Sequence, residues 1–293
     1  MSRVEVLKTY KIYIDGKFPR TESGRFYTPK SGGNSLGNIC LSSRKDFRNA
    51  VVAARNGFGK WSNATAYNRS QILYRIAEML EGRKAQFIDE LIKQGSSKAN
   101  ANKEVESSID RIIYYAGWCD KYSQLFSAVN PVATSHFNFT SPEPTGVVSI
   151  FAPEENSLIG LVSTIIPIIA SGNTCVVLAS ENLPLCAITF AEVVNSSDVP
   201  GGVINILTGQ RSELLEHMAS HMDVNAFLYA GSNEKEILTI EKLAVDNLKR
   251  VRIKDFSKIY SVEHETPYYI EDFLEMKTTW HPIEKIGATG SGY

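Results

Sequence analysis

The chain has 293 residues, of which 43% are hydrophobic and 22% are charged, and this globular composition excludes an intrinsically disordered protein. Its 31 basic and 32 acidic side chains leave a net charge of −1, so no global field draws it to nucleic acid or to an anionic membrane. The N-terminus lacks an apolar signal-peptide core, and no apolar run is long enough to span a bilayer. We therefore expect a cytoplasmic protein with no nucleic-acid or membrane partner.

The N-terminal part, residues 1–130, is predicted to be mainly helical. Within it, a strand over 10–17 precedes the helices and ends at Asp15-Gly16, a hairpin-turn dipeptide. Ser43 and Asp46 form an S-x-x-D pattern, similar to the capping box that starts a helix. Apolar residues then recur at helical spacing. The predicted helices span 43–60, 68–93 and 103–126.

The second half of the chain alternates strand and helix patterns between residues 146 and 258. Short apolar runs predict strands that are buried on both faces. Alternating β and α elements predict a parallel sheet with helices on both faces, a Rossmann-like α/β fold. The predicted strands are 146–151, 174–178, 203–207, 225–229 and 250–254, and the predicted helices are 157–170, 183–195, 211–220 and 233–246. Between the two halves, His136–Thr140 alternates polar and aromatic residues as a two-sided strand would.

Several short motifs follow one another in order over residues 143–251. Together they resemble the cofactor-binding domain of aldehyde dehydrogenases, although each motif alone is a weak signal. The resemblance implies the same α/β domain over 146–258, and a small oligomerisation element made of a β-flap over 131–145 and a tail strand within 268–293. The motifs are Glu143-Pro144-Thr-Gly-Val-Val148, Ala170-Ser-Gly-Asn-Thr174, Val199-Pro-Gly-Gly-Val-Ile-Asn205, Tyr229-Ala-Gly-Ser232 and Asn247-Leu-Lys-Arg-Val251.

The resemblance implies a chemistry whose residues this chain lacks. In that family a thiolate attacks the aldehyde and hydride passes to a nicotinamide, with an Asn amide and a Glu base assisting. Here Glu155 takes the place of the Asn, and Lys254, interpreted as a solvated surface lysine, takes the place of the Glu. No cysteine follows Cys186, and the four cysteines are interpreted as buried thiols in a reducing compartment. We predict no catalytic residue.

The cofactor site implied by the resemblance is also altered. The family's ribose-binding Lys is replaced by Leu178, and a phosphate-side glycine is replaced by Glu236, whose charge repels a pyrophosphate. Turn and cap geometry is the competing explanation for the residues that survive. We expect no cofactor, with NAD or NADP as the alternative. The vestigial cofactor-binding candidates are Ser180, Glu181, Gly209, Gly231 and Ser232.

A metal site is not expected. His217 and His221 are four residues apart on one predicted helix, as zinc ligands can be, but no third ligand completes a motif.

A second set of segments lies outside the cofactor-binding motifs: Asn49-Ala-Val-Val-Ala-Ala-Arg55, Thr65 to Leu73, Asp120-Lys-Tyr122 and Trp280-His-Pro282. With them the chain resembles, over about residues 10–283, the non-catalytic carboxyl-terminal half of family-16 aldehyde dehydrogenases. That half packs against a true catalytic domain. The resemblance implies a shortened, inactive protein that serves as a structural partner of a catalytic aldehyde dehydrogenase domain or of a second copy of itself. The alternative is an NAD(P)-binding oxidoreductase or nucleotide sensor of the same family. Whether the chain is complete or part of a larger protein stays open.

Overall fold

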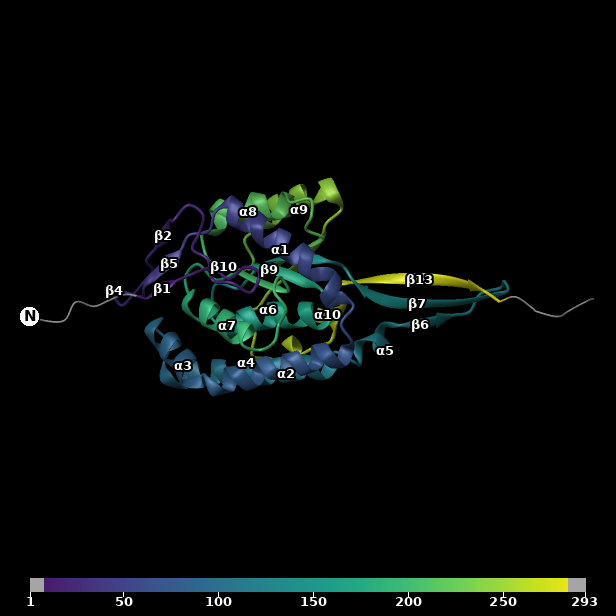
Figure 1. Cartoon of the computed structure of the whole chain (residues 1–293), viewed down its shortest axis with the longest axis horizontal. Helices are drawn as coiled ribbons and strands as arrows, with labels where there is room; N and C mark the ends of the chain where they lie inside the picture. The colour runs from purple at the N-terminus through teal and green to yellow at the C-terminus, as the bar shows by residue number, and fades with distance from the viewer. Residues whose placement is uncertain (1–7, 284–293) are drawn as a thin grey trace, which may run out of the picture.

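The computed structural model describes residues 8–283, and its centre is a parallel sheet of five strands in the order β10-β9-β8-β11-β12 (Figure 1). The first four strands are completely buried, as apolar runs covered on both faces should be. Each predicted strand is found within one residue of its predicted bounds. The strands are β8 (Val147–Phe151), β9 (Thr174–Leu178), β10 (Ile204–Leu207), β11 (Ala226–Ala230) and β12 (Arg250–Lys254).

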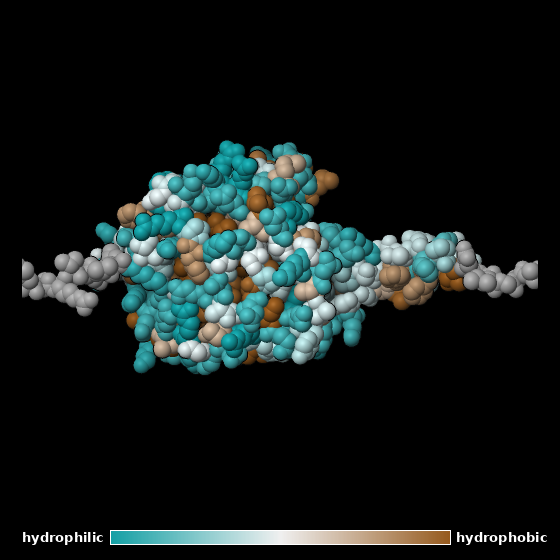
Figure 2. Space-filling view, in the orientation of Figure 1, coloured by the Kyte–Doolittle hydropathy of each residue, from teal (hydrophilic) through white to brown (hydrophobic). Residues whose placement is uncertain are grey.

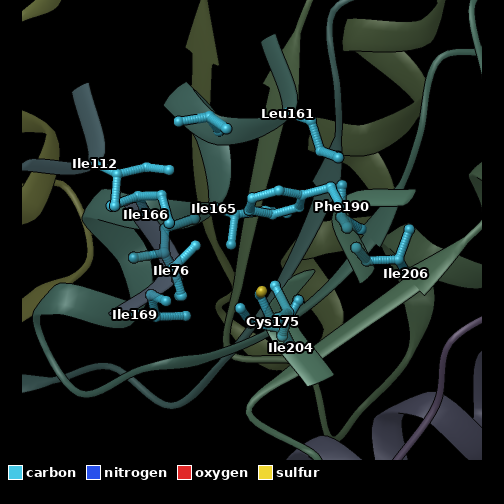
Figure 3. Packing of buried hydrophobic residues seen from close by; sticks show 14 of the residues in the cluster. Ile76, Ile112, Leu161, Ile165, Ile166, Ile169, Cys175, Phe190, Ile204 and Ile206 are labelled. Atoms are coloured by element: carbon cyan, nitrogen blue, oxygen red, sulfur yellow. The ribbon is translucent and has the colours of Figure 1, made fainter. Parts of the chain in front are cut away.

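Helices cover both faces of this sheet, which confirms the predicted fold class (Figure 1). One face carries α1 (Arg44–Ser62), α8 (Arg211–Ser220) and α9 (Glu234–Ala244). The other face carries α6 (Ile159–Ala170) and α7 (Leu185–Asn195), which form an apolar core with the strands. Figure 3 shows Phe190 of α7 among Leu161, Ile165 and Ile206.

Three helices over residues 66–118 form a layer outside α6 and α7, and a short fourth helix follows them next to the arm; these helices correct two predictions. The helix predicted over 68–93 breaks at Gly82-Arg83, where the Arg83 side chain turns to bond Gln86 and Glu192. Because the apolar stripe continues across the break, periodicity could not reveal it. The helix predicted over 103–126 begins earlier, after the cap Ser97, and also breaks. The observed helices are α2 (Ala66–Gly82), α3 (Lys84–Lys93), α4 (Lys98–Trp118) and α5 (Tyr122–Phe126).

The predicted strand over 10–17 is only partly present. Asp15 and Gly16 have φ of 54° and 71°, the pair of positive values of a type I′ turn, so the turn is confirmed. The prediction of one continuous strand is wrong. Ile12 and Tyr13 are both buried, so the predicted alternation of buried and exposed side chains is absent. The segment leaves a small sheet after Tyr10 and reaches the edge of β10, where Tyr13 pairs with Ile206. The small sheets use β1 (Thr9–Tyr10), β2 (Phe26–Tyr27), β3 (Lys30–Ser31), β4 (Asn34–Ser35) and β5 (Asn38–Cys40).

A three-stranded antiparallel arm projects from this body (Figure 1). Its strands are β6 (Ala128–Asn130), β7 (His136–Pro144) and β13 (Leu274–Pro282), with β7 in the centre. The flap and the tail strand therefore pair with each other over nine residues, from Leu274 opposite Pro144 to Pro282 opposite His136.

Asn173 joins the arm to the central sheet. Its carboxamide oxygen accepts from Gly146 N at the start of β8, at 2.7 Å, and its nitrogen donates to the carbonyl of Phe273 before β13, at 2.8 Å. Asn173 is fully buried. One side chain therefore fixes the root of the arm to the body.

The chain between β12 and β13 forms α10 (Tyr268–Glu271) and a 3₁₀ turn over Val262–His264, and another 3₁₀ turn, Val245–Asn247, precedes β12. Among the helices of residues 8–283, none is both long and apolar enough to cross a membrane.

Candidate functional site

A polar cleft lies at the carboxyl ends of β8, β9 and β11. β9 lies on one side of β8 and β11 on the other, so the cleft is at the topological switch point, where open α/β sheets bind ligands. Loops after the strands and the starts of α8 and α9 supply its walls. The lining residues are Glu154, Glu155, Glu181, Asn182, Arg211, Ser212, Tyr229, Ala230, Gly231, Ser232, Asn233 and Glu236.

Arg211 is the central side chain of this cleft. It starts α8, its Nε lies 2.9 Å from Glu154 Oε1, and it donates to the carbonyl of Ala152. Its guanidinium lies over the rings of Phe151 and Tyr229, 5.4 and 5.6 Å from their centroids. Only 13% of the side chain is exposed. The guanidinium thus covers the carboxyl ends of β8 and β11, the two neighbouring strands at the switch point.

Glu154 is held from the opposite wall. Its Oε2 accepts from Ser180 Oγ at 2.9 Å and from the backbone and side-chain nitrogens of Asn182 at 3.2 and 3.1 Å. Ser180 Oγ in turn accepts from Leu183 N at 3.0 Å. The loop after β9 is therefore organised around the carboxylate after β8.

The N-terminus of α9 is capped by its own residues. The Asn233 side chain accepts from Lys235 N and Glu236 N at 3.1 and 3.5 Å. Glu236 accepts the phenol proton of Tyr229 at 2.6 Å, and burial together with this carboxylate raises the pKa of Tyr229 to about 12. Two of the amide groups that could have held an anion at this helix start already have partners.

The charge of the cleft is acidic. Its lining includes four carboxylates and one guanidinium, that of Arg211. The four carboxylates belong to Glu154, Glu155, Glu181 and Glu236.

The predicted cofactor residues fall into three places. Glu181, Gly231 and Ser232 line the cleft. Ser180 is buried beneath it and organises the loop after β9. Gly209 follows β10 and does not line the cleft. It packs against the backbone at Ser42, because a Cβ added to Gly209 would lie 3.2 Å from Ser42 N.

Sequence reasoning missed Arg211 and Glu154, the pair that dominates the cleft. The available signal was position, because both lie within four residues of the carboxyl end of a predicted strand. Their pairing could not be found, since they are 57 positions apart and meet only through the strand order.

The positions matched to catalytic groups do not meet as an active site. Glu155 is exposed at the cleft. Lys254, interpreted as a solvated lysine, is only partly solvated: its side chain is 28% exposed, pairs with Asp272 at 2.7 Å and lies 4.8 Å from the ring centroid of Tyr269. All four cysteines are buried. Burial raises the pKa of Cys119 and of Cys175 to about 12, so neither is poised as a thiolate.

His217 in the last turn of α8 and His221 at its C-cap are not part of a metal-binding group of side chains among the described residues. His221 packs edge-on against Phe47, and its Nδ1 accepts from Asp223 N at 3.2 Å. Over residues 8–283, no group of three or more His, Cys, Asp or Glu side chains is arranged to hold a metal ion.

Comparison with known proteins places these observations in a family context. A family model described as "Aldehyde dehydrogenase family" matches residues 19–254. The DhaS protein of Bacillus subtilis (strain 168) is 32% identical over 254 residues, which cover 84% of this chain and 50% of that protein. Human mitochondrial 10-formyltetrahydrofolate dehydrogenase is 29% identical over 261 residues, covering 87% of this chain and 28% of that protein.

Solved structures agree on the fold. PnpE from Pseudomonas sp. WBC-3 superimposes with a TM-score of 0.80 at 26% identity, over 85% of this chain and 51% of PnpE. The NAD+ complex of an aldehyde dehydrogenase from Bacillus cereus gives a TM-score of 0.79 at 24% identity, over 84% of this chain and 50% of that one. The chain thus spans about half the length of DhaS and of these two structures.

Proposed function

Because this chain belongs to the aldehyde dehydrogenase family, we propose that it is a non-catalytic assembly domain whose arm pairs with a catalytic aldehyde dehydrogenase chain or with a second copy of itself. The observation that carries the proposal is the outer edge of β13. This strand has nine residues and pairs only with β7 within the described part of the chain, so its other edge is open to another strand. The closer likeness to the family-16 half remains a prediction.

Apolar side chains on the arm support a role in association. Figure 2 shows brown, apolar atoms on the projecting arm. Val129, Phe137 and Trp280 are 68%, 45% and 56% exposed. Val129 and Phe137 also line a shallow groove with Phe139 on the surface of the paired strands β6 and β7. Large exposed apolar side chains gathered on one element are typical of interaction surfaces.

The cleft supports the proposal that this chain is not catalytic. The four carboxylates repel the pyrophosphate of a dinucleotide, and the Arg211 guanidinium already occupies the switch point. The start of α9, which could have held a phosphate, is capped by Asn233. These residues do not fit NAD or NADP, so we derive no reaction step through either cofactor.

Co-purification tests the assembly function. Purified full chain is mixed with a catalytic aldehyde dehydrogenase polypeptide, and the two are followed by size-exclusion chromatography with light scattering. We expect co-elution that is lost in Thr278→Pro, which blocks the open edge of β13, and kept in Tyr67→Ala, on the exposed face of α2. If the chain associates neither with the catalytic polypeptide nor with itself, the assembly function is wrong.

A second candidate is a nucleotide sensor. Glu181, Gly231 and Ser232 do line one cleft, and Arg211 could hold a phosphate if it left Glu154. Isothermal titration with NAD and with NADP decides between the two functions. Binding at millimolar cofactor that is lost in Arg211→Ala would favour the sensor, and the absence of heat with a folded protein would eliminate it.

A further inference from the structure

Residues 255–272, which we call the strap, join the end of β12 to the root of the arm. The match to the family model ends at residue 254, so the strap lies outside it. Its helical parts are the 3₁₀ turn Val262–His264, of three residues, and α10, of four residues. Helical pieces this short are not stable by themselves. The strap therefore keeps its place through contacts with the rest of the molecule.

The strap covers an apolar patch at the carboxyl end of the central sheet. Phe256 and Ile259 form a small buried cluster with Ile159, at the start of α6, and with Ala230, at the end of β11. Each of these four residues is at most 4% exposed. Ala230 also lines the polar cleft. If the strap came away, an apolar surface would therefore open to water directly beside the cleft.

Side chains of α4 hold the strap in place. Arg111 is only 1% exposed, and its guanidinium donates to the carbonyl of Ile259 at 2.9 Å and lies 3.5 Å from Glu265. The hydroxyl of Tyr115 donates to the carbonyl of Thr266 at 3.2 Å. The contact between α4 and the strap thus contains a buried positive charge.

His264 is the histidine of the strap, and it is 8% exposed. Its ring stacks on Phe256 with the centroids 5.4 Å apart, and its Nδ1 lies 2.8 Å from the hydroxyl oxygen of Tyr269. A neutral imidazole keeps one nitrogen that accepts a hydrogen bond, whereas an imidazolium has none. Proton uptake would therefore place a charge between two aromatic rings and change the hydrogen bonding of the strap.

The surroundings of His264 favour its neutral form. Burial is the main cause of its lowered pKa, and the positive charges of Arg111 and Lys254 lower that pKa further. The carboxylates of Asp255 and Glu263 act in the opposite direction but do not outweigh these causes. The titratable and charged groups around His264 are Arg111 of α4 with its partner Glu265, Lys254 of β12 with its partner Asp272, and Asp255, Glu263 and Tyr269 of the strap.

We propose that the strap is a pH-released cover: in mildly acidic solution His264 takes up a proton, the strap detaches, and the apolar patch of Ile159 and Ala230 beside the cleft is exposed. In the detached strap His264 is in water, where its pKa is about 6.5. In the attached strap the pKa of His264 is lower, so the detached form binds the proton more readily. The ratio of detached to attached strap therefore rises as pH falls through about 6.5, by at most about tenfold between pH 7.5 and pH 5.5.

Hydrogen exchange of the full chain, followed by mass spectrometry and corrected for intrinsic rates, tests the cover. Between pH 7.5 and pH 5.5 we expect the protection of residues 256–272 to fall by up to about tenfold, while the protection of β8 and β9 stays constant. His264→Gln should remove this pH dependence, because glutamine does not titrate. His221→Gln is the matched control. Burial lowers the pKa of His221 as well, but this ring packs against Phe47 of α1, so the strap should respond as in the wild type.

Two further measurements separate proton uptake from simple loosening of the strap. Tyr115→Phe removes one bond to the strap without changing a group that titrates near pH 6, so exchange of the strap should rise at both pH values and the pH step should remain. If His264→Gln loosens the strap at both pH values, His264→Phe, which keeps a ring to stack on Phe256, takes its place and must also lack the step.

Binding of the apolar dye anilinonaphthalene sulfonate reports the exposed patch itself. The dye should bind more strongly at pH 5.5 than at pH 7.5 in the wild type, and equally at both pH values in the His264 variant. Three results would overturn the inference: a strap whose protection does not change with pH, a His264 variant that keeps the full pH step, or a loss of protection that is as large in β8 and β9 as in the strap.

Discussion

At the residue scale, Arg211 is expected to stabilise the cleft that it fills. Arg211→Ala leaves the Glu154 carboxylate without its ion-pair partner and the Ala152 carbonyl without its guanidinium donor, in a place where the Arg211 side chain is mostly buried. We expect a loss of about 1–3 kcal/mol in the free energy of unfolding, measured by urea denaturation. The control is Arg25→Ala, whose partner Glu213 is also on α8 but whose ion pair is exposed, and it should leave stability unchanged within error. Equal effects of the two variants would contradict this role of Arg211.

Glu90, near the end of α3, gives a prediction about pH at the same scale. Its carboxyl is buried and accepts from Thr189 Oγ1 at 2.7 Å and from Tyr10 OH at 3.2 Å. Burial raises the pKa of Glu90 in spite of these bonds and of the nearby Lys8. The native carboxyl therefore keeps its proton to a higher pH than the unfolded one, whose pKa is about 4.3. Stability should fall as pH rises from about 4.3 through the raised pKa.

Glu90→Gln tests this sign, because glutamine does not titrate. We expect the loss of Tm with rising pH to be smaller in Glu90→Gln than in the wild type, as followed by differential scanning calorimetry. Asp89→Asn, at the exposed neighbouring position, is the matched control and should keep the wild-type slope. Parallel curves for the wild type and Glu90→Gln would show that the burial of Glu90 is not what sets the slope.

At the element scale, α1 depends on the capping box that the sequence predicted. Ser43 accepts from Asp46 N, and Asp46 Oδ2 accepts in return from Ser43 N at 2.8 Å. Ser43→Ala should lower the free energy of unfolding by about 1 kcal/mol, measured by thermal or urea denaturation. Ser212→Ala, at an exposed serine in the first turn of α8, serves as the control and should change little. A stable Ser43→Ala protein would mean that packing alone fixes the start of α1.

The sequence predicted buried strands well, and it predicted elements that depend on distant partners poorly. β9 matches its predicted bounds because a short run that is apolar on both faces is a local signal, and β12 matches although its valine and isoleucine alternate with charged residues. The break at Arg83 was missed because Glu192, one of its partners, is 109 positions away. β6 was missed because its three residues, two exposed and one half-buried, show no polar–apolar alternation. The Arg211–Glu154 pair was missed for the same reason as the Arg83 break, since only the sheet order brings the two together.

At the scale of the whole molecule, thiol chemistry should be blocked in the native state. The four cysteines are buried in different parts of the core, and burial raises the pKa of the Cys186 thiol as it does those of Cys119 and Cys175. In Ellman's assay at pH 8 we expect no rapid reaction of the folded protein, and reaction of all four thiols after denaturation. A native thiol that reacts within seconds would contradict this expectation, and that cysteine would become a candidate nucleophile.

The Asn173 joint also has a thermodynamic consequence for association. Asn173 joins the start of β8 to the root of β13 through buried hydrogen bonds, so the arm is fixed to the body and is not a hinged flap. The entropy of ordering its strands is lost during folding and need not be lost again on contact. Association through a preorganised edge should therefore show a fast on-rate and a small change in heat capacity compared with a segment that folds only when it binds. The Asn173 carboxamide, which fixes the arm to the central sheet, therefore influences the kinetics and thermodynamics with which the arm binds its partner.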